Sequence, residues 1–154
     1  MAVNYIPEGY QPLTPYLQVK NAAAAIEFYK NAFGAKEIGR IMMGPDIIGH
    51  AEIELFKARI LLADVNEEWG NKGPQELGGS PVSLCLYVED VDAVYAKAIA
   101  AGATVTKGMD VKDQFYGDRS GCLTDPFGHE WTILTHKEDV SFEELQKRSD
   151  DICK

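Results

Sequence analysis

The sequence predicts an α+β fold made of two tandem βαβββ modules, and two observations support this prediction. An extended apolar run leads into an alanine-rich helical segment at Tyr16–Phe33, and the same order returns at Leu84–Ala101. Gly-Ala then closes both segments, beginning at Gly34 and Gly102. Because a solenoid needs at least three repeats, a long pattern that occurs only twice indicates a duplicated pair of small modules.

The first module is predicted to contain one strand, one helix and three further strands, at Tyr16–Val19, Ala22–Ala32, Glu37–Met43, His50–Phe56 and Arg59–Asp64. Its helix has apolar residues on one face, and Asn21 is suited to cap its start while Gly34 ends it. Lys57 and Ala58 join the last two strands, and this connection is short enough for a hairpin turn.

The second module repeats this order after a segment rich in glycine and proline, which marks a linker. Its elements are predicted at Val82–Val88, Asp90–Ala101, Thr104–Lys107, Arg119–Thr124 and Trp131–Thr135. Beyond them, Ser141 and Glu144 form the capping-box pattern that opens a charged helix. The chain is thus expected to divide into an N-terminal arm, module one, a linker, module two and a C-terminal helix, at residues 1–12, 13–65, 66–81, 82–137 and 138–154.

Composition and charge narrow the possible classes of function. The chain has 154 residues, of which 45% are hydrophobic and 25% charged, as is ordinary for a soluble globular protein. A net charge of −9 makes nucleic acid and anionic membranes poor partners. The first residues lack the basic and apolar regions of a signal peptide, and no run of about 18 apolar residues could span a membrane. Three cysteines without a spacing motif indicate reduced thiols, so we expect a cytoplasmic protein.

Two motifs carry a resemblance to a known family. The first helix reads Ala-Ile-Glu-Phe-Tyr-x-x-x-Phe-Gly-Ala, and Asp-Pro-Phe-Gly-His precedes the last strand. With the tandem βαβββ order, these motifs resemble the vicinal oxygen chelate superfamily, which includes glyoxalase I, bleomycin resistance proteins and extradiol dioxygenases. Further segments resemble its PhnB-like branch, at Thr14–Leu17, Phe28–Ala35, His50–Ile53 and Tyr116–Gly121. The resemblance implies two four-stranded mixed sheets that curl into cups and line one cavity, commonly in a homodimer.

The resemblance also implies where a metal would bind. Metal-dependent members hold one divalent ion with His, Gln or Glu from the first and last strand of each module. By position, the corresponding residues are Thr14 or Tyr16, Leu62 or Ala63, Ser83 or Cys85, and Thr132. None of these is a His, a Gln or a carboxylate, whereas such ions need oxygen or imidazole ligands from several strands. We therefore expect no cofactor, with a divalent metal held elsewhere as the alternative.

His50 and Glu52 are the residues best suited to chemistry. They alternate with Ala51 and Ile53 on one predicted strand, so both project to the face opposite the apolar one. On a wet face the pair is simply solvated. In a cavity it would bind a ligand or transfer protons, with Glu52 holding the imidazole tautomer. His50 and Glu52 are therefore the candidate catalytic residues, and whether any reaction is catalysed stays open.

Strand alternation extends the candidate site to other strands. The apolar residues of each module's first strand are predicted to face the helices, which turns their alternate neighbours toward the cavity: Tyr16, Gln18, Cys85 and Tyr87. Tyr116 and Arg119 enter a later strand, where an arginine would offer a forked donor to an anionic ligand. Alternatively, Arg119 pairs structurally with Asp118 or Asp125.

The predicted ligand-binding set is therefore Tyr16, Gln18, His50, Glu52, Cys85, Tyr87, Tyr116 and Arg119. His129 is expected to hydrogen-bond its own turn, and His136 to be exposed after the last strand. The favoured interpretation is a homodimeric PhnB-like protein that binds a small organic ligand in a cup-shaped cavity without the usual metal ligands. The alternatives are a metal-dependent lyase or dioxygenase of glyoxalase type, with His50 and Glu52 as ligands, and an antibiotic-sequestering resistance protein.

Overall fold

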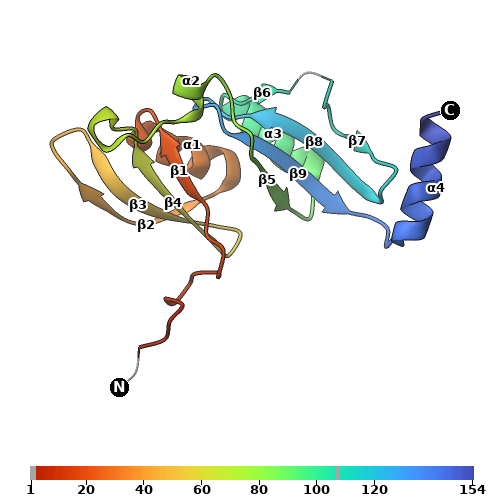
Figure 1. The fold of residues 1–154 in the computed structure, drawn as a ribbon, viewed down its shortest axis with the longest axis horizontal. Helices are drawn as coiled ribbons and strands as arrows, with labels where there is room; N and C mark the ends of the chain where they lie inside the picture. Colours follow the sequence, from red (N-terminus) through yellow and green to blue (C-terminus); the bar gives the residue numbers. More distant parts are fainter. Residues whose placement is uncertain (1–2, 107) are drawn as a thin grey trace. The chain divides into compact units, whose positions relative to one another are not determined.

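The structure, a computed structural model, describes residues 3–106 and 108–154, so Lys107, the expected end of a strand, lies outside the described residues. The chain forms two compact units. Unit one contains the residues up to 80 together with Pro126–Gly128, and unit two contains the remainder. Each unit holds one mixed sheet with a helix packed against it, which confirms the predicted pair of βαβββ modules (Figure 1).

The regular elements of unit one begin with β1 (Tyr16–Val19), α1 (Ala22–Phe33), β2 (Lys36–Met42), β3 (Ile48–Leu55) and β4 (Ala58–Asp64). The four strands lie in the order β1-β4-β3-β2, in which β1 and β4 are parallel and the other neighbours antiparallel. The segment predicted as a linker contains the 3₁₀ helix η1 (Glu67–Trp69) and the short helix α2 (Pro74–Leu77). Both belong to unit one.

Asp64, the last residue of β4, organises the start of α1 and the start of β3. Its Oδ1 accepts a hydrogen bond from the backbone N–H of Ala22 at 2.7 Å, and its Oδ2 accepts one from Ile48 at 2.8 Å. Asn21 caps the same helix, since its side chain accepts a hydrogen bond from the Ala24 N–H at 3.0 Å. A helix start leaves several N–H groups without intrahelical partners, and these two side chains satisfy two of them.

The hairpin between β3 and β4 turns one residue earlier than predicted. Phe56 and Lys57 occupy the two turn positions, with φ of 46° and 70°, and Ala58 already belongs to β4. Positive φ at both central residues matches the twist of a two-residue hairpin. The strand β3 also begins before the predicted position, at Ile48, whose N–H is bound by Asp64.

The core of unit one lies between α1 and one face of the sheet, and we call the other face of each sheet, which carries neither α1 nor α3, its open face. Along β3, Ala51 and Ile53 are buried while His50 and Glu52 are partly exposed, which confirms the predicted alternation. The largest fully buried side chains of this core are Val19, Ile26, Tyr29, Ile48, Ile53, Leu55 and Leu62. The open face is therefore left to polar residues that the core does not need.

Pro126–Gly128, which are distant in sequence, also belong to unit one. The ring centroid of Phe127 lies 6.2 Å from that of Phe28 and 6.5 Å from that of Tyr29. The neighbouring Gly128 has φ of +90°, and a Cβ added to it would lie 2.8 Å from Cβ of Pro74. A residue with a side chain would be both strained and obstructed at this position, so glycine is required.

The regular elements of unit two are β5 (Ser83–Tyr87), α3 (Val91–Ala101), β6 (Thr104–Val105), β7 (Lys112–Asp113), β8 (Asp118–Thr124), β9 (Glu130–His136) and α4 (Phe142–Ile152). The sheet has the order β5-β9-β8-β6, and β7 also pairs with β8. The two-residue strand β7 lies in a segment for which the sequence predicts no strand, and its pairing with β8 rather than an apolar pattern defines it. The predicted C-terminal helix is confirmed as α4, with Ser141 accepting a hydrogen bond from the Glu144 N–H at 3.2 Å.

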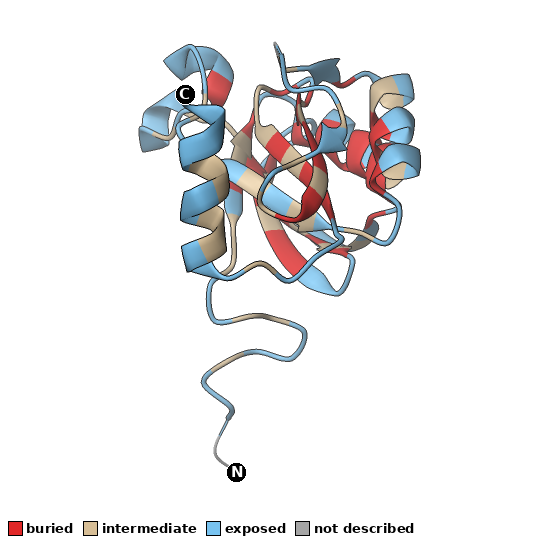
Figure 2. Ribbon diagram, turned by 90° about the vertical axis from the view of Figure 1, so that its right-hand side faces the viewer, coloured by how far each residue is buried: buried red, intermediate tan, exposed pale blue. Residues whose placement is uncertain are grey.

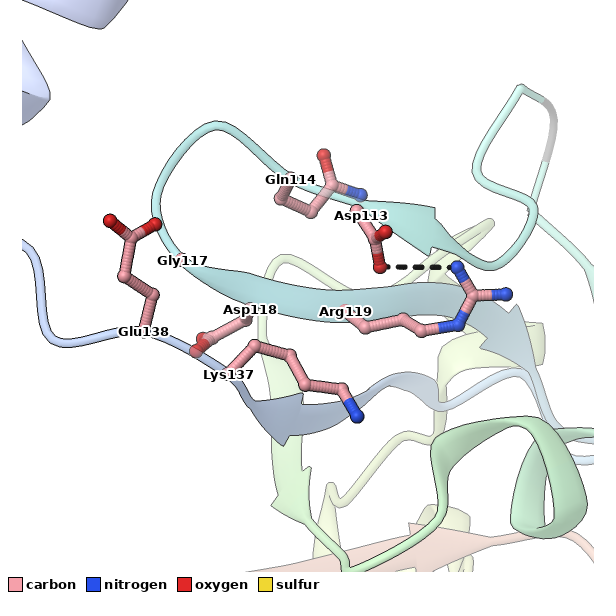
Figure 3. Close-up of a pocket in the computed structure, with 7 residues that line it drawn as sticks. All are labelled: Asp113, Gln114, Gly117, Asp118, Arg119, Lys137 and Glu138. Carbon is pink, nitrogen blue, oxygen red and sulfur yellow. Dashed lines mark hydrogen bonds and ion pairs between the residues drawn. The ribbon is translucent and has the colours of Figure 1, made fainter.

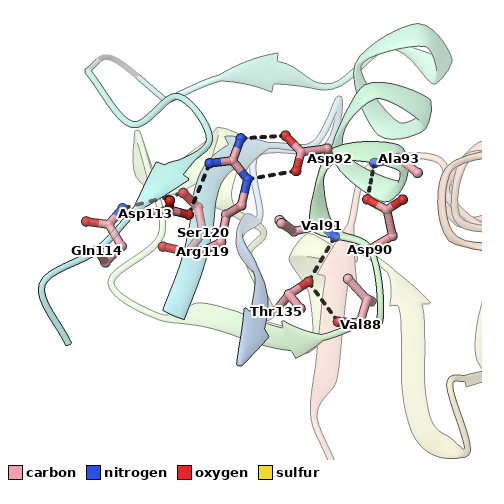
Figure 4. Close-up of polar contacts among 10 residues, drawn as sticks. All are labelled: Val88, Asp90, Val91, Asp92, Ala93, Asp113, Gln114, Arg119, Ser120 and Thr135. Carbon is pink, nitrogen blue, oxygen red and sulfur yellow. Dashed lines mark hydrogen bonds and ion pairs between the residues drawn. The ribbon is translucent and has the colours of Figure 1, made fainter. Parts of the chain in front are cut away.

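Polar side chains organise the start of α3 (Figure 4). Asp90 accepts a hydrogen bond from the Ala93 N–H at 3.0 Å and so acts as the N-cap. From the sheet side, the Thr135 hydroxyl accepts a hydrogen bond from the Val91 N–H and donates one to the Val88 carbonyl, both at 2.9 Å. Thr135 therefore ties β9 directly to the helix start.

The helix α4 is held by ion pairs rather than by burial, since none of its residues is buried (Figure 2). Arg148 carries most of these contacts. Its guanidinium lies 2.8 Å from a carboxylate oxygen of Glu138 and 3.1 Å from one of Glu144. It also donates a hydrogen bond to the Phe115 carbonyl at 3.1 Å. This one side chain links α4 to the loop before it and to the segment that precedes β8.

Candidate functional site

The open face of unit one carries a connected row of polar side chains. Tyr16 on β1 places its hydroxyl 2.9 Å from Nδ1 of His50 on β3. His50 Nε2 lies 3.4 Å from Oε1 of Glu52, which is a longer contact. A neutral imidazole satisfies both partners when Nε2–H donates to Glu52 and Nδ1 accepts the Tyr16 O–H. Three residues of the predicted set therefore meet on one face, and Glu52 is positioned to hold the tautomer as expected.

Arg59 on β4 extends this row to a third strand. Its Nη1 donates a hydrogen bond to Oε2 of Glu52 at 2.7 Å, and the residue is only 7% exposed. The ring of Tyr10, in the N-terminal arm, lies over the guanidinium, 5.2 Å from its Cζ. Gln11 fixes the arm to the same strand, because its side-chain amide donates to the Arg59 carbonyl at 2.7 Å and accepts from its N–H at 3.0 Å.

Glu52 carries the negative charge of this row. A hydrogen bond from Tyr10 lowers the pKa of Glu52 below its ordinary value, and the contacts with His50 and Arg59 lower it further. The same hydrogen bond raises the pKa of Tyr10. Burial raises the pKa of Tyr16, which keeps its hydroxyl protonated as a donor. Glu52 is thus an ionised acceptor surrounded by donors at neutral pH.

A cavity of about 320 Å³ adjoins the row, lined by Ile38, Gly39, Arg40, Ile41, His50 and Glu52. Its lining combines two exposed apolar side chains of β2, Ile38 and Ile41, with one guanidinium, one imidazole and one carboxylate. Gln18 shares the open face with Tyr16 by strand alternation, and its Oε1 accepts a hydrogen bond from Asn71 at 2.6 Å. A small organic molecule with a polar group would find complementary surfaces here.

The open face of unit two carries a second group of aromatic and polar residues. Tyr87 donates a hydrogen bond to Oδ2 of the buried Asp118 at 3.1 Å, and burial raises the pKa of its phenol. The Tyr116 hydroxyl lies 2.9 Å from Oγ of Ser120 on the same face. Cys85, two residues before Tyr87, is exposed there as well. Cys85 and Tyr87 therefore lie on the face that strand alternation predicted, whereas Tyr116 reaches this face from the turn before β8 and not from a strand.

His136 belongs to this second group and is exposed as expected, but it lies within the last strand rather than after it, and it has two carboxylate partners. It is the final residue of β9, and its Nδ1 lies 2.6 Å from Oδ1 of Asp118. Its Nε2 lies 3.0 Å from Oδ1 of Asp139. Hydrogen bonds to Asp139 and to Asp118 raise the pKa of His136. A hollow of about 560 Å³ is lined by these residues and by Tyr87, Tyr116, Glu138, Val140, Ser141 and Leu145.

Arg119 lies on the other face, so the prediction that it shares the open face with Tyr87 and Tyr116 is wrong. Its guanidinium is forked onto Asp92 of α3 at 2.7 and 2.8 Å (Figure 4) and lies 3.2 Å from Asp113 of β7. Neither Asp118 nor Asp125, the partners considered from the sequence, is involved in these ion pairs. Arg119 lines a separate open hollow of about 540 Å³ around the β7–β8 hairpin (Figure 3).

The residues at the family's metal positions do not fit a divalent ion. Tyr16 is hydrogen-bonded to His50, and Leu62 is a buried aliphatic residue. The Thr132 hydroxyl lies 3.0 Å from that of Ser83. The described residues contain no group of three or more His, Cys, Asp or Glu side chains that could hold a metal ion. Hydroxyls and aliphatic groups are poor ligands for such ions, so the residues at these positions do not form a divalent-metal site.

Sequence reasoning missed four residues of these two groups: Tyr10, Arg59, Asp118 and His136. Arg59 could have been found by continuing the alternation of β4, where it pairs in register with Glu54 of the polar β3 face. Asp118 and His136 are likewise opposite each other on β8 and β9. Both cases need the strand register, which periodicity along one strand does not supply. Tyr10 had no signal, because its place depends on the path of the arm.

The state of the cysteines and the length of the helices bear on the protein's surroundings. Cys85, Cys122 and Cys153 are free thiols. In the part of the chain that the structure describes, no helix is both long enough and apolar enough to cross a membrane.

Comparison with known proteins places the chain in a family. Residues 11–133 match the Glyoxalase/Bleomycin resistance protein/Dioxygenase superfamily, so the chain belongs to it. An uncharacterized protein of Mycobacterium tuberculosis is 42% identical over 150 residues, which cover 95% of this chain and 84% of that protein. An uncharacterized Arabidopsis thaliana protein is 29% identical over 79% of this chain and 75% of its own length.

Solved structures agree on the fold. The X-ray structure of an Arabidopsis thaliana gene product has a TM-score of 0.65 at 29% identity, covering 80% of this chain and 97% of that chain. A putative 3-demethylubiquinone-9 3-methyltransferase, PhnB protein, from Bacillus cereus has a TM-score of 0.61 at 20% identity, covering 81% and 99%. A bleomycin resistance determinant encoded on transposon Tn5 has a TM-score of 0.60 at 18% identity, covering 83% and 99%. At these last two identities the likeness is one of fold alone.

Proposed function

We propose that this protein binds a small organic molecule on the open face of unit one, without a metal ion. One observation carries the proposal: Tyr16, His50, Glu52 and Arg59 form a continuous row of donors and acceptors beside a cavity. The core of the unit does not need these side chains, since α1 covers the opposite face. A few convergent polar groups in an apolar hollow are typical of a ligand site.

The row favours recognition of a polar ligand group over covalent chemistry. His50 can donate or accept a hydrogen bond depending on its protonation, whereas Glu52 accepts and Arg59 only donates. The open face of unit two, with Tyr87, is a second candidate surface. The prediction that both open faces line one cavity stays a prediction.

Two finer assignments belong to the same proposal. We place the chain in the PhnB-like branch, which is supported by the segments at Thr14–Leu17 and His50–Ile53, the segments that supply Tyr16, His50 and Glu52. A cytoplasmic location is supported by the free state of Cys85, Cys122 and Cys153, since reducing compartments keep thiols unpaired. A homodimer is proposed from the family resemblance.

The test of ligand binding starts from a fragment screen read by thermal shift on the full chain. For fragments that bind, His50→Ala should weaken binding by about tenfold or more, since removing one partner leaves the other polar groups of the row unsatisfied. The unfolding temperature without ligand should change little, because His50 lies outside the core.

The matched control is His136→Ala, which removes a hydrogen-bonded histidine from unit two instead. It should leave binding at unit one unchanged. Binding should also survive a chelator. Loss of binding with EDTA, restored by one divalent ion per chain, would show that a metal site carries the function.

A further inference from the structure

Resting on the proposed function, we infer that Arg59 anchors an oxyanion of the ligand, such as a carboxylate, and that the N-terminal arm covers this anchor in the unliganded chain. The inference begins from an unsatisfied donor. Among the described residues, Nε of Arg59 is a buried side-chain nitrogen without a hydrogen-bond partner, although the residue is more than nine-tenths buried. A buried donor without an acceptor is costly, and such groups in native proteins call for an explanation.

The unsatisfied nitrogen lies on one edge of the guanidinium. Glu52 is bound through Nη1, which leaves the edge formed by Nε and Nη2 free of that carboxylate. This edge presents two parallel N–H donors, the geometry that matches the two oxygens of a carboxylate or phosphate. A lysine would offer a single charge at the same place and no fork. The two N–H donors of the Nε–Nη2 edge therefore favour an oxyanion as their partner.

The arm occupies the space beside that edge. A Cβ added to Gly9 would lie 2.5 Å from Nη2 and 3.9 Å from Nε of Arg59, so the backbone of the arm covers the fork. Gly9 has φ of +81°, and a glycine is what lets the chain approach so closely. Next to it, Tyr10 covers the guanidinium through its ring.

This cover is held by Gln11 at its C-terminal end and by a hydrogen bond from Tyr10 to Glu52. Gln11 binds the backbone of Arg59 through two hydrogen bonds, and the arm before it includes Val3 and Tyr5, which are 93% and 91% exposed. Lifting Gly9 and Tyr10 would expose the fork and leave Gln11 in place. An entering oxyanion would then satisfy Nε, which the arm does not.

Glu52 connects the anchor to the cavity. It receives a hydrogen bond from Arg59 on one side and lies against His50, which lines the cavity, on the other. A ligand whose oxyanion sits on Arg59 would therefore extend its uncharged part past Glu52 toward His50. Benzoate has both parts, and benzamide is its uncharged match.

The test observes the Arg Nε–Hε signals of the ¹⁵N-labelled full chain by NMR, with the Arg59 signal assigned by its loss in Arg59→Lys. Benzoate and inorganic phosphate are titrated separately, with benzamide as the control. Benzoate should move the Arg59 signal saturably, whereas benzamide should not. A larger and tighter response to phosphate would identify phosphate as the oxyanion. No movement with either anion would overturn the inference.

Removing the cover supplies a second measurement. Tyr10→Ala should tighten benzoate binding by about two- to fivefold, as expected when the cation–π contact with Arg59 and the hydrogen bond to Glu52 no longer hold the cover closed. Tyr5→Ala, an exposed tyrosine of the same arm, should change nothing. Equal affinities in the two variants would contradict the arm's role as a cover.

The same titrations distinguish a failure of the oxyanion anchor from a failure of the proposed binding function. If benzoate and benzamide both shift the His50 ring signals with the same affinity and the Arg59 signal stays fixed, unit one binds small molecules and the oxyanion anchor is wrong. If neither compound nor phosphate shifts any signal of the row, both the anchor and the proposed binding face fail for these probes.

Discussion

At the scale of single residues, the two histidines on the open faces differ in their partners. His50 has one phenol and one carboxylate, and it lies between Tyr16 and Glu52. His136 has a carboxylate at each ring nitrogen, Asp118 from β8 and Asp139 from the following loop. Both ring nitrogens donate only in the protonated imidazole, so two carboxylates favour that form. His136 therefore holds Asp118 and Asp139 together when its imidazole is charged, and we call this arrangement the His136 clamp.

This charge makes the clamp sensitive to pH. The pKa of His136 is raised in the folded chain, so its stabilising effect is complete below the ordinary value near 6.5 and is lost as the pH rises through the folded-state pKa. We expect the difference in urea midpoint between the wild type and His136→Gln to shrink as the pH rises from about 6 to about 9. Because the side chain is about half exposed, the effect should be small and reduced by salt. A difference independent of pH would contradict the clamp.

At the scale of elements, local periodicity predicted most of the fold. The helices α1 and α3 and the strands that flank them follow from apolar spacing and capping residues within each segment. What could not be predicted depends on partners far along the chain. The strand β7 exists only through its pairing with β8, and Arg119 binds Asp92 of α3, which lies on the other side of the predicted site. The strand register and the choice of ion-pair partner depend on the packed structure, so neither produces a periodic pattern in the sequence.

The contacts of Asp64 give a test at this scale. Its two carboxylate oxygens bind the first N–H groups of α1 and of β3, so one side chain starts two elements. Asp64→Ala should lower the free energy of unfolding by about 2–3 kcal/mol, the sum expected for a lost cap and an unsatisfied N–H. Asp46→Ala, which removes an exposed carboxylate from the loop before β3, should change it by less than about 0.5 kcal/mol. Urea denaturation measures both, and equal effects would contradict the assigned role.

At the scale of the whole molecule, each sheet ends in edge strands that must be paired, covered or blunted. In unit one the edges are β1 and β2. The pairing of β2 with β3 is interrupted by register shifts, and β2 exposes Ile38, Ile41 and Met42. An irregular edge is a poor template for strand addition, yet exposed apolar side chains on it favour a partner surface. These observations support the homodimer that the family resemblance implies.

We therefore expect the purified chain to sediment as a two-fold dimer at micromolar concentration. Ile41→Lys, which places a charge on the exposed edge, should shift the equilibrium toward the monomer, whereas Lys36→Ala at the start of the same strand should have little effect. Sedimentation equilibrium over a range of concentrations provides the measurement. A wild type that stays monomeric throughout would remove the homodimer from the proposal.

The small group Pro126–Gly128 makes unit one discontinuous in the sequence. Phe127 belongs to the aromatic cluster of Phe28 and Tyr29, although the rest of its turn belongs to the other unit. A gene that encoded only the residues up to 80 would therefore make a first half without one of its rings. Separation of the two halves of the sequence would therefore leave the first half with an incomplete aromatic cluster.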